Sequence, residues 1–174
     1  DVQTPPMAME AVRSMDRTVL EYSPSEGFVS YRRGLASYYS SVGVDVTPDQ
    51  IMVTTGGSEA LAFAFMACLD PGDEVIIPEP FYANYNGFAA TSGVRIVPVT
   101  ALLDDGFALP SMDAFEELIT ERTKAILICN PGNPSGRKYE NNSLDTLAEL
   151  VKKHDLYLVA DEVYREFNYD GELS

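Results

Sequence analysis

Hydrophobic positions along this chain follow two alternating patterns. Short runs rich in branched aliphatic side chains are typical of parallel strands that are buried on both faces. The stretches between them carry apolar side chains every three to four residues, as on one face of a helix. Because strands and helices alternate, the sequence predicts a three-layer α/β/α fold with a mostly parallel sheet. The predicted strands cover residues 51–54, 74–78, 95–99, 124–129 and 157–160.

Several helices are predicted between and before these strands. Ser111 and Ser143 can each accept a hydrogen bond from a free backbone N–H, so each predicts the cap of a helix. Residues 59–69 are apolar nearly all round, which predicts a buried helix. Two earlier helices are predicted over residues 5–19 and 29–42.

The length and the order of these elements indicate one domain with an N-terminal extension. A chain of 174 residues can bury a sizeable core. Residues 1–45 are predicted to form an N-terminal helical segment, and residues 46–174 the α/β part.

Composition excludes several classes of function. The formal net charge of −15 argues against binding to nucleic-acid phosphates. The longest strongly apolar run, residues 60–69, is far shorter than the ~18 residues that indicate a membrane span. The sequence shows no basic start followed by an apolar stretch, so no signal peptide is indicated and a cytoplasmic location is expected. Cys68 and Cys129 indicate neither a disulfide framework nor a metal site, and a catalytic role for His154 is disfavoured.

Three motifs fall where predicted strands end, the edge at which open α/β sheets bind ligands. The first runs Thr54-Thr55-Gly56-Gly57-Ser58, and the helix start that follows offers free N–H groups to an anion. The same residues also suit a plain turn with a serine cap. The second runs Asn130-Pro131-Gly132-Asn133-Pro134-Ser135-Gly136, in which two Asn-Pro pairs stiffen the loop. The third is Asp161 with Tyr164, and Asp161 alone also suits a helix cap or an ion pair.

In this order and at these separations, the three motifs resemble the pyridoxal-phosphate aminotransferases of the aspartate aminotransferase superfamily (fold type I). The resemblance starts at Thr4-Pro5 and covers essentially the whole chain. It implies that residues 46–174 belong to the cofactor-binding large domain. It also implies transfer of an amino group between an amino acid, possibly aspartate, and a 2-oxo acid.

The resemblance assigns roles at the matching positions. Asp161 would pair with the protonated pyridine nitrogen of pyridoxal 5'-phosphate, the implied cofactor. Asn133 and Tyr164 would hydrogen-bond the 3-oxygen of the ring. The remaining matching positions are Gly57, Ser58 and Glu59 at the cofactor phosphate, Tyr82 stacked on the ring, and Tyr22 reaching the phosphate of the neighbouring subunit, which implies a homodimer.

The chain departs from the family pattern in one respect that concerns the chemistry. The lysine that would hold the cofactor as a Schiff base should follow Asp161 by a few dozen residues, and none of the four lysines of this chain matches it. We therefore expect a large-domain fragment that is inactive alone. Two alternatives stay open. One is a C–S lyase or synthase of the same fold, and the other is a non-catalytic aminotransferase-like module.

Overall fold

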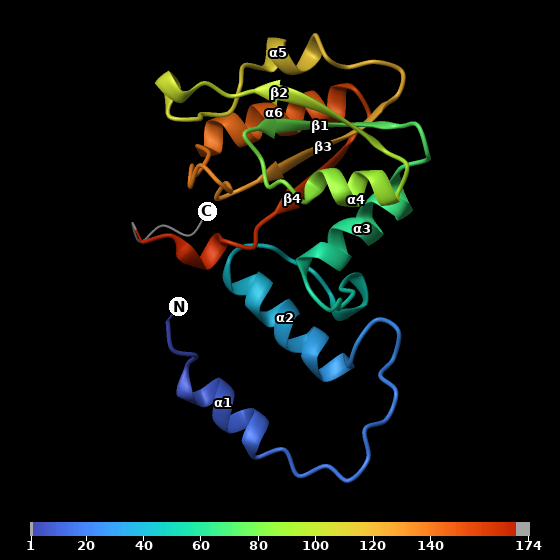
Figure 1. The fold of residues 1–174 in the computed structure, drawn as a ribbon, viewed down its shortest axis with the longest axis vertical. Helices are drawn as coiled ribbons and strands as arrows, with labels where there is room; N and C mark the ends of the chain where they lie inside the picture. Colours follow the sequence, from blue (N-terminus) through green and yellow to red (C-terminus); the bar gives the residue numbers. More distant parts are fainter. Residues whose placement is uncertain (1, 170–174) are drawn as a thin grey trace. The chain divides into compact units, whose positions relative to one another are not determined.

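The computed structural model describes residues 2–169 (Figure 1). The chain divides into two compact units, with the boundary between Met52 and Val53. Within residues 2–169, no helix combines the length and the apolarity that crossing a membrane requires.

The first unit contains helices α1 (Pro6–Arg13) and α2 (Val29–Ser41) and the short 3-10 helix η1 (Pro48–Gln50). Helix α2 ends one residue before its predicted end. Helix α1 starts near its predicted position but ends at Arg13, six residues early. All its side chains are exposed. Short helices depend on packing for most of their stability. The apolar side chains of residues 14–19 are exposed, so no packing stabilises a helix as far as residue 19.

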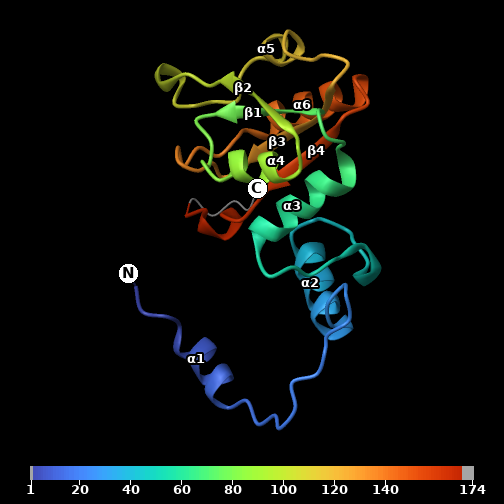
Figure 2. The ribbon, with the colours of Figure 1, turned by 45° about the vertical axis from the view of Figure 1, so that its right-hand side comes forward.

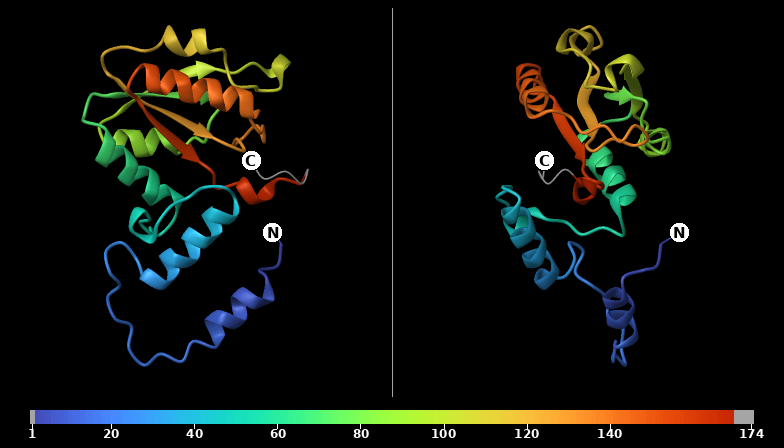
Figure 3. Two further views of the ribbon diagram at one scale, coloured as in Figure 1. Left: turned by 180° about the vertical axis from the view of Figure 1, so that it is seen from behind. Right: turned by 90° about the vertical axis from the view of Figure 1, so that its left-hand side faces the viewer.

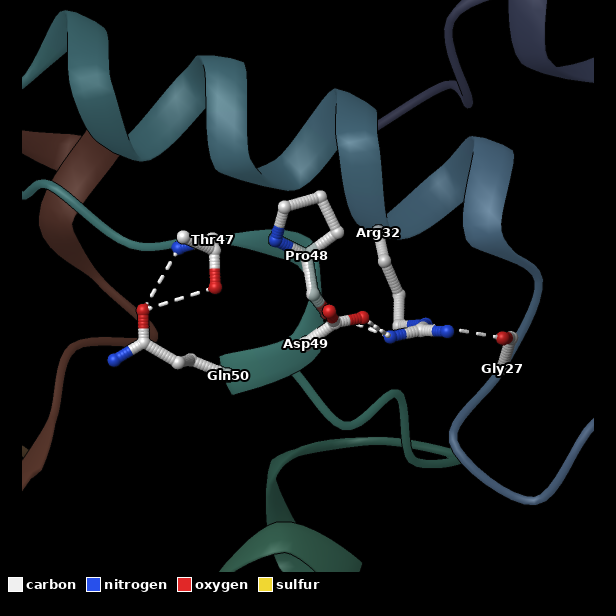
Figure 4. Close-up of polar contacts among 6 residues, drawn as sticks. All are labelled: Gly27, Arg32, Thr47, Pro48, Asp49 and Gln50. Carbon is white, nitrogen blue, oxygen red and sulfur yellow. Dashed lines mark hydrogen bonds and ion pairs between the residues drawn. The ribbon is translucent and has the colours of Figure 1, made fainter.

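An arginine fastens the loop of residues 43–50 to helix α2 within this unit (Figure 4). The Arg32 guanidinium donates to the carbonyl oxygens of Gly27 at 3.2 Å and Pro48 at 2.6 Å. Asp49 lies 3.5 Å from it. The side chain of Gln50 accepts the N–H of Thr47 at 2.9 Å, which closes the turn at the start of η1. These contacts account for Thr47, Asp49 and Gln50 without a ligand.

The second unit is built on four parallel strands (Figure 1). Their order across the sheet is β2-β1-β3-β4, and all three neighbouring pairs run in parallel. Each strand confirms a predicted run and is one residue longer than predicted. The bounds are β1 (Glu74–Glu79), β2 (Arg95–Thr100), β3 (Thr123–Cys129) and β4 (Tyr157–Asp161).

Two pairs of helices cover the two faces of this sheet (Figures 2 and 3). Helices α3 (Gly57–Cys68) and α4 (Tyr85–Thr91) bury side chains against one face. Helices α5 (Met112–Glu116) and α6 (Asn141–Lys153) do so against the other. The 3-10 helices η2 (Leu103–Asp105) and η3 (Arg165–Phe167) lie in the connections. The predicted three-layer α/β/α fold is therefore confirmed.

Strand β3 shows how the sequence builds both cores. Ala125, Leu127 and Cys129 face the α3 and α4 side, whereas Ile126 and Ile128 face the α5 and α6 side. All five side chains are buried, because a central strand is covered on both faces. A continuously apolar run is the sequence pattern that this position requires.

Three local predictions were wrong. Residues 51–54 form no strand, because within residues 2–169 no β-strand pairs with them. Helix α3 is only half buried: Leu61 and Phe65 lie in the core, whereas Met66 is 59% exposed. Ser143 does not cap α6, because the helix already begins at Asn141 and Glu140 occupies the cap position. The predicted cap at Ser111 is confirmed, since its side chain accepts the N–H of Ala114.

Because the strands are parallel, the loops that follow them lie at one end of the sheet, the carboxyl end. The chain passes from β1 to β2 through α4, and from β3 to β4 through α6 on the opposite face. The strand order therefore reverses between β1 and β3. Open α/β sheets bind ligands beside the carboxyl ends of their strands at such a switch point.

Candidate functional site

A cavity of about 200 Å³ lies beside this switch point, lined by residues at or after the carboxyl ends of β1, β3 and β4. Its lining combines the starts of α3 and α4 with the loops after these strands. Only one lining residue carries a formal charge, and the rest are apolar, aromatic or neutral polar. The lining residues are Gly57, Ser58, Leu61, Tyr82, Tyr85, Phe88, Cys129, Asn133, Asp161, Val163 and Tyr164.

Asp161, the last residue of β4, is the charged residue of this lining. Its Oδ2 accepts the hydroxyl of Tyr85 at 2.7 Å, and its Oδ1 accepts the backbone N–H of Val163 at 3.2 Å. Within residues 2–169, no arginine or lysine forms an ion pair with this carboxylate. A half-buried carboxylate whose protein partners are neutral suits a ligand that brings a positive charge.

Asn133 and Tyr164 come together beside Asp161. The Asn133 side chain donates its Nδ2 hydrogen to the Tyr164 hydroxyl oxygen at 3.3 Å, although the two residues belong to different loops. Asn133 comes from the Asn-Pro loop after β3, and Tyr164 follows β4. The amide and the hydroxyl can both donate to one oxygen of a ligand.

The start of α3 forms another wall of the cavity. Gly57 and Ser58 are its first two residues, and the first N–H groups of a helix have no partner inside the helix. A Cβ atom built on Gly56 or Gly57 would meet nothing within 4 Å, so the backbone is open to an approaching ligand. The Glu59 carboxylate accepts the N–H of Thr55 at 2.6 Å, and this bond lowers the pKa of Glu59. Glu59 therefore fixes the turn before the helix and does not line the cavity.

The two remaining aromatic candidates lie in different units. Tyr82 lines the cavity from the segment before α4, and its hydroxyl oxygen accepts the Nδ2 hydrogen of Asn84 at 2.7 Å. Tyr22 belongs to the first unit, where its side chain is fully exposed. Its expected contact with a neighbouring subunit stays a prediction.

None of the four lysines, all within the described residues, lines the cavity. The Lys124 ammonium donates to the Glu121 carbonyl oxygen at the amino end of β3. The ammonium groups of Lys152 and Lys153 pair with Glu149 and Glu116. Lys138 follows the Asn-Pro loop. No lysine of this chain is therefore positioned to bond covalently with a ligand in the cavity.

The polar groups that line the cavity fit a flat aromatic ligand that carries a cationic ring nitrogen, a ring oxygen and an anionic group. Asp161 can hold the cationic nitrogen, and Asn133 with Tyr164 can hold the ring oxygen. The start of α3 can hold the anion, because its free N–H groups and helix dipole favour negative charge. Pyridoxal phosphate has these three features, so the residues present fit this cofactor.

Comparison with known proteins supports this interpretation. The family model of aminotransferase class I and II matches residues 1–173. The chain belongs to this family. It is 38% identical over 174 residues to an aspartate/prephenate aminotransferase of Thermus thermophilus, covering 99% of this chain and 45% of that protein. It is 37% identical over 176 residues to an aspartate aminotransferase of Thermotoga maritima, covering 100% of this chain and 46% of that protein.

Solved aminotransferase structures have the same fold. An aspartate aminotransferase from Thermus thermophilus with maleate superimposes with a TM-score of 0.91 at 38% identity, covering 99% of this chain and 45% of that one. An alanine aminotransferase from Pyrococcus furiosus superimposes with a TM-score of 0.91 at 33% identity, covering 99% and 44%. The chain thus spans less than half the length of these relatives.

Tyr85 is a polar residue of this cavity to which sequence reasoning gave no role. Its side chain is fully buried and lines the cavity, and burial together with the hydrogen bond to Asp161 raises its pKa. The available signal was its position three residues after Tyr82, about one helical turn away. That spacing marks a shared side of a helix but not a bond to a strand 76 positions later.

Proposed function

We propose that the protein is a pyridoxal-phosphate-dependent aminotransferase and that the cavity at β3 and β4 holds the cofactor ring. The observation that carries this proposal is the Asp161 carboxylate, the single charge of the lining, whose protein partners are neutral donors. When bound, the cofactor supplies an electron-withdrawing ring that accepts charge from the α-carbon of an amino acid. This chain's own residues bind and orient that ring.

Asp161 would hold the proton at the pyridine nitrogen. A carboxylate beside a ring nitrogen favours the protonated form, because the opposite charge stabilises it. Asn133 and Tyr164 would both donate to the 3-oxygen of the ring. Their mutual hydrogen bond of 3.3 Å supports this assignment, since it brings the amide and the hydroxyl to one point of the cavity.

Gly57 and Ser58 would hold the phosphate through the first N–H groups of α3 and the Ser58 hydroxyl. Glu59 would act indirectly, because its carboxylate would repel a phosphate but its bond to Thr55 fixes the turn. Tyr82 would stack on the ring face. Within this proposal, residues 46–174 belong to the cofactor-binding domain and residues 1–45 to its N-terminal segment.

The substrates would be an amino acid and a 2-oxo acid. Relatives named as aspartate and aspartate/prephenate aminotransferases support aspartate as the first donor to test. We further propose a homodimer in which Tyr22 reaches the phosphate of the neighbouring subunit. A cytoplasmic location remains a prediction from the sequence.

The test uses the complete gene product. Purified protein is mixed with pyridoxal phosphate and assayed for transfer of the amino group from aspartate to 2-oxoglutarate, with a panel of other donors alongside. Cofactor binding with amino transfer supports the proposal. Binding with cleavage of a carbon–sulfur bond and no transfer would instead assign a lyase, and no binding would assign a non-catalytic module.

A further inference from the structure

Tyr85 connects two elements that are distant in sequence. It is the first residue of α4, its ring is fully buried, and its Oη donates to Asp161 Oδ2 at 2.7 Å. A buried hydroxyl without a partner costs free energy, so this bond satisfies the tyrosine as well as the carboxylate. The contact therefore restricts the orientation of the Asp161 carboxylate, which packing of the ring alone would not do.

The bond also fixes how the Asp161 carboxylate is turned. Oδ1 accepts the N–H of Val163 at 3.2 Å while Oδ2 accepts the Tyr85 hydroxyl, so each oxygen has one protein donor. Two donors at different oxygens define the plane of the group. Each carboxylate oxygen can accept more than one hydrogen bond, so acceptor capacity remains for a ligand.

The Tyr85 ring is itself held by two aromatic neighbours. Phe81 stacks on it with ring centroids 6.1 Å apart, and Tyr82 meets it edge-on at 5.6 Å. The titratable groups that face its hydroxyl are Asp161 of β4 and the buried Cys129 of β3, whose thiol has its pKa raised by burial. The hydroxyl thus lies in a rigid apolar surrounding, in which a hydrogen bond to a carboxylate is strong.

We propose that Tyr85 is a positioning residue that acts through Asp161 on the ring nitrogen of the cofactor. It does not touch the cofactor nitrogen itself. Its hydroxyl holds the carboxylate in the orientation that meets the nitrogen and stabilises the anionic form that pairs with a cation. This inference rests on the proposed function, because it requires pyridoxal phosphate in the cavity.

The experiment measures cofactor affinity in the complete gene product with the Tyr85→Phe variant. Phenylalanine keeps the ring and removes only the hydroxyl. We expect about tenfold weaker binding of pyridoxal phosphate, the loss typical of one hydrogen bond to a charged group. The second probe is 1-deazapyridoxal phosphate, which has carbon in place of the ring nitrogen. Its affinity should change by less than about twofold, because it offers Asp161 no cationic nitrogen.

Two controls separate positioning from structural support. Tyr139→Phe removes a hydroxyl from a buried tyrosine in the core on the other face of the sheet and should leave both affinities unchanged. In an Asp161→Ala background, Tyr85→Phe should change pyridoxal-phosphate affinity by less than about twofold, because the intermediary is gone.

The possible outcomes distinguish the two proposals. The positioning role is overturned if Tyr85→Phe weakens the binding of pyridoxal phosphate and of its 1-deaza analogue equally. It is also overturned if Tyr85→Phe weakens pyridoxal-phosphate binding to the full extent in the Asp161→Ala background. In both cases the proposed function stands. If the wild-type protein binds neither cofactor, the proposed function fails and the inference fails with it.

Discussion

The two ends of the sheet in the second unit hold their carboxylates in different ways. At the amino end, Glu74 is buried with Oε1 3.2 Å from the Arg95 guanidinium and Oε2 accepting the Thr120 hydroxyl at 2.9 Å. At the carboxyl end, Asp161 accepts hydrogen bonds from the neutral groups of Tyr85 and Val163. Glu74 thus has a cation of its own, whereas within residues 2–169 no arginine or lysine pairs with Asp161.

This difference separates a carboxylate that is paired within the fold from the one to which we assign the proposed function. Glu74 joins the starts of β1 and β2 to the turn before β3, so its contacts stabilise the sheet. Asp161 is fixed in direction but not neutralised. A charge that is oriented without being paired is what electrostatic binding of a cation requires. The comparison predicts that removing Glu74 weakens the fold, and that removing Asp161 weakens the reaction.

The largest effect is expected for Asp161→Ala in the complete gene product. The ring nitrogen would lose its counter-charge, so kcat/KM for amino transfer should fall about 10²- to 10³-fold, as for other preorganised electrostatic contacts. The cofactor-free variant should still unfold cooperatively, but at a lower temperature than the wild type, because the buried Tyr85 hydroxyl loses its hydrogen-bond partner. Steady-state kinetics and thermal unfolding provide the measurements. Near-normal turnover would show that Asp161 is not the partner of the nitrogen.

Glu74→Ala should lower the stability of the fold without changing the affinity for the cofactor. Thr120 loses a hydrogen-bond partner and Arg95 its ion pair, so the free energy of unfolding should fall by about 1–3 kcal/mol. Urea unfolding measures this loss. Glu74→Gln is the matched control: it keeps the size and an acceptor for Thr120, and should lose less. Pyridoxal-phosphate affinity should stay unchanged in both variants, and a weakened affinity would contradict the separation of the two ends.

Ser58→Ala tests the anion-binding wall at the carboxyl end. The variant loses the hydroxyl donor but keeps the backbone N–H groups at the start of α3, so pyridoxal-phosphate affinity should fall about tenfold. Pyridoxal without the phosphate is the matched ligand, and its affinity should not change. Equal losses for the two ligands would remove Ser58 from the phosphate site.

The sequence predicted the sheet well because each strand leaves a local signal. The central strands β1 and β3 are buried on both faces, and each contains a continuous apolar run, at residues 75–77 and 125–129. Residues 51–54 carry the same signal but form no strand, because a strand also needs a hydrogen-bonded neighbour. Such a partner is a property of the whole sheet, so a short run of sequence cannot reveal it.

In the candidate site, the residues of the sequence motifs were predicted and a contact between distant elements was not. Ser58, Asn133 and Asp161 belong to motifs whose turns and prolines are visible in sequence, and the structure brings all three to one cavity. Tyr85 could not be assigned in this way, because its contact with Asp161 depends on how α4 packs against the sheet. Of all the predicted cofactor residues in the second unit, only Glu59 does not line the cavity.

The smallest effect is expected for Glu116→Gln at the amino end, where this carboxylate joins α5 to His154, just after α6, and to Lys153, the last residue of α6. These partners lower the pKa of Glu116 below 4.5. A lowered folded-state pKa contributes stability above pH 4.5 that disappears as the pH falls through the lowered value. The variant should therefore shift the urea midpoint slightly downward near neutral pH, and this shift should shrink as the pH is lowered through the pKa of Glu116. Glu149→Gln, which removes an exposed pair within α6, is the matched control. A shift that persists at acidic pH would mean that the carboxylate charge is not its source.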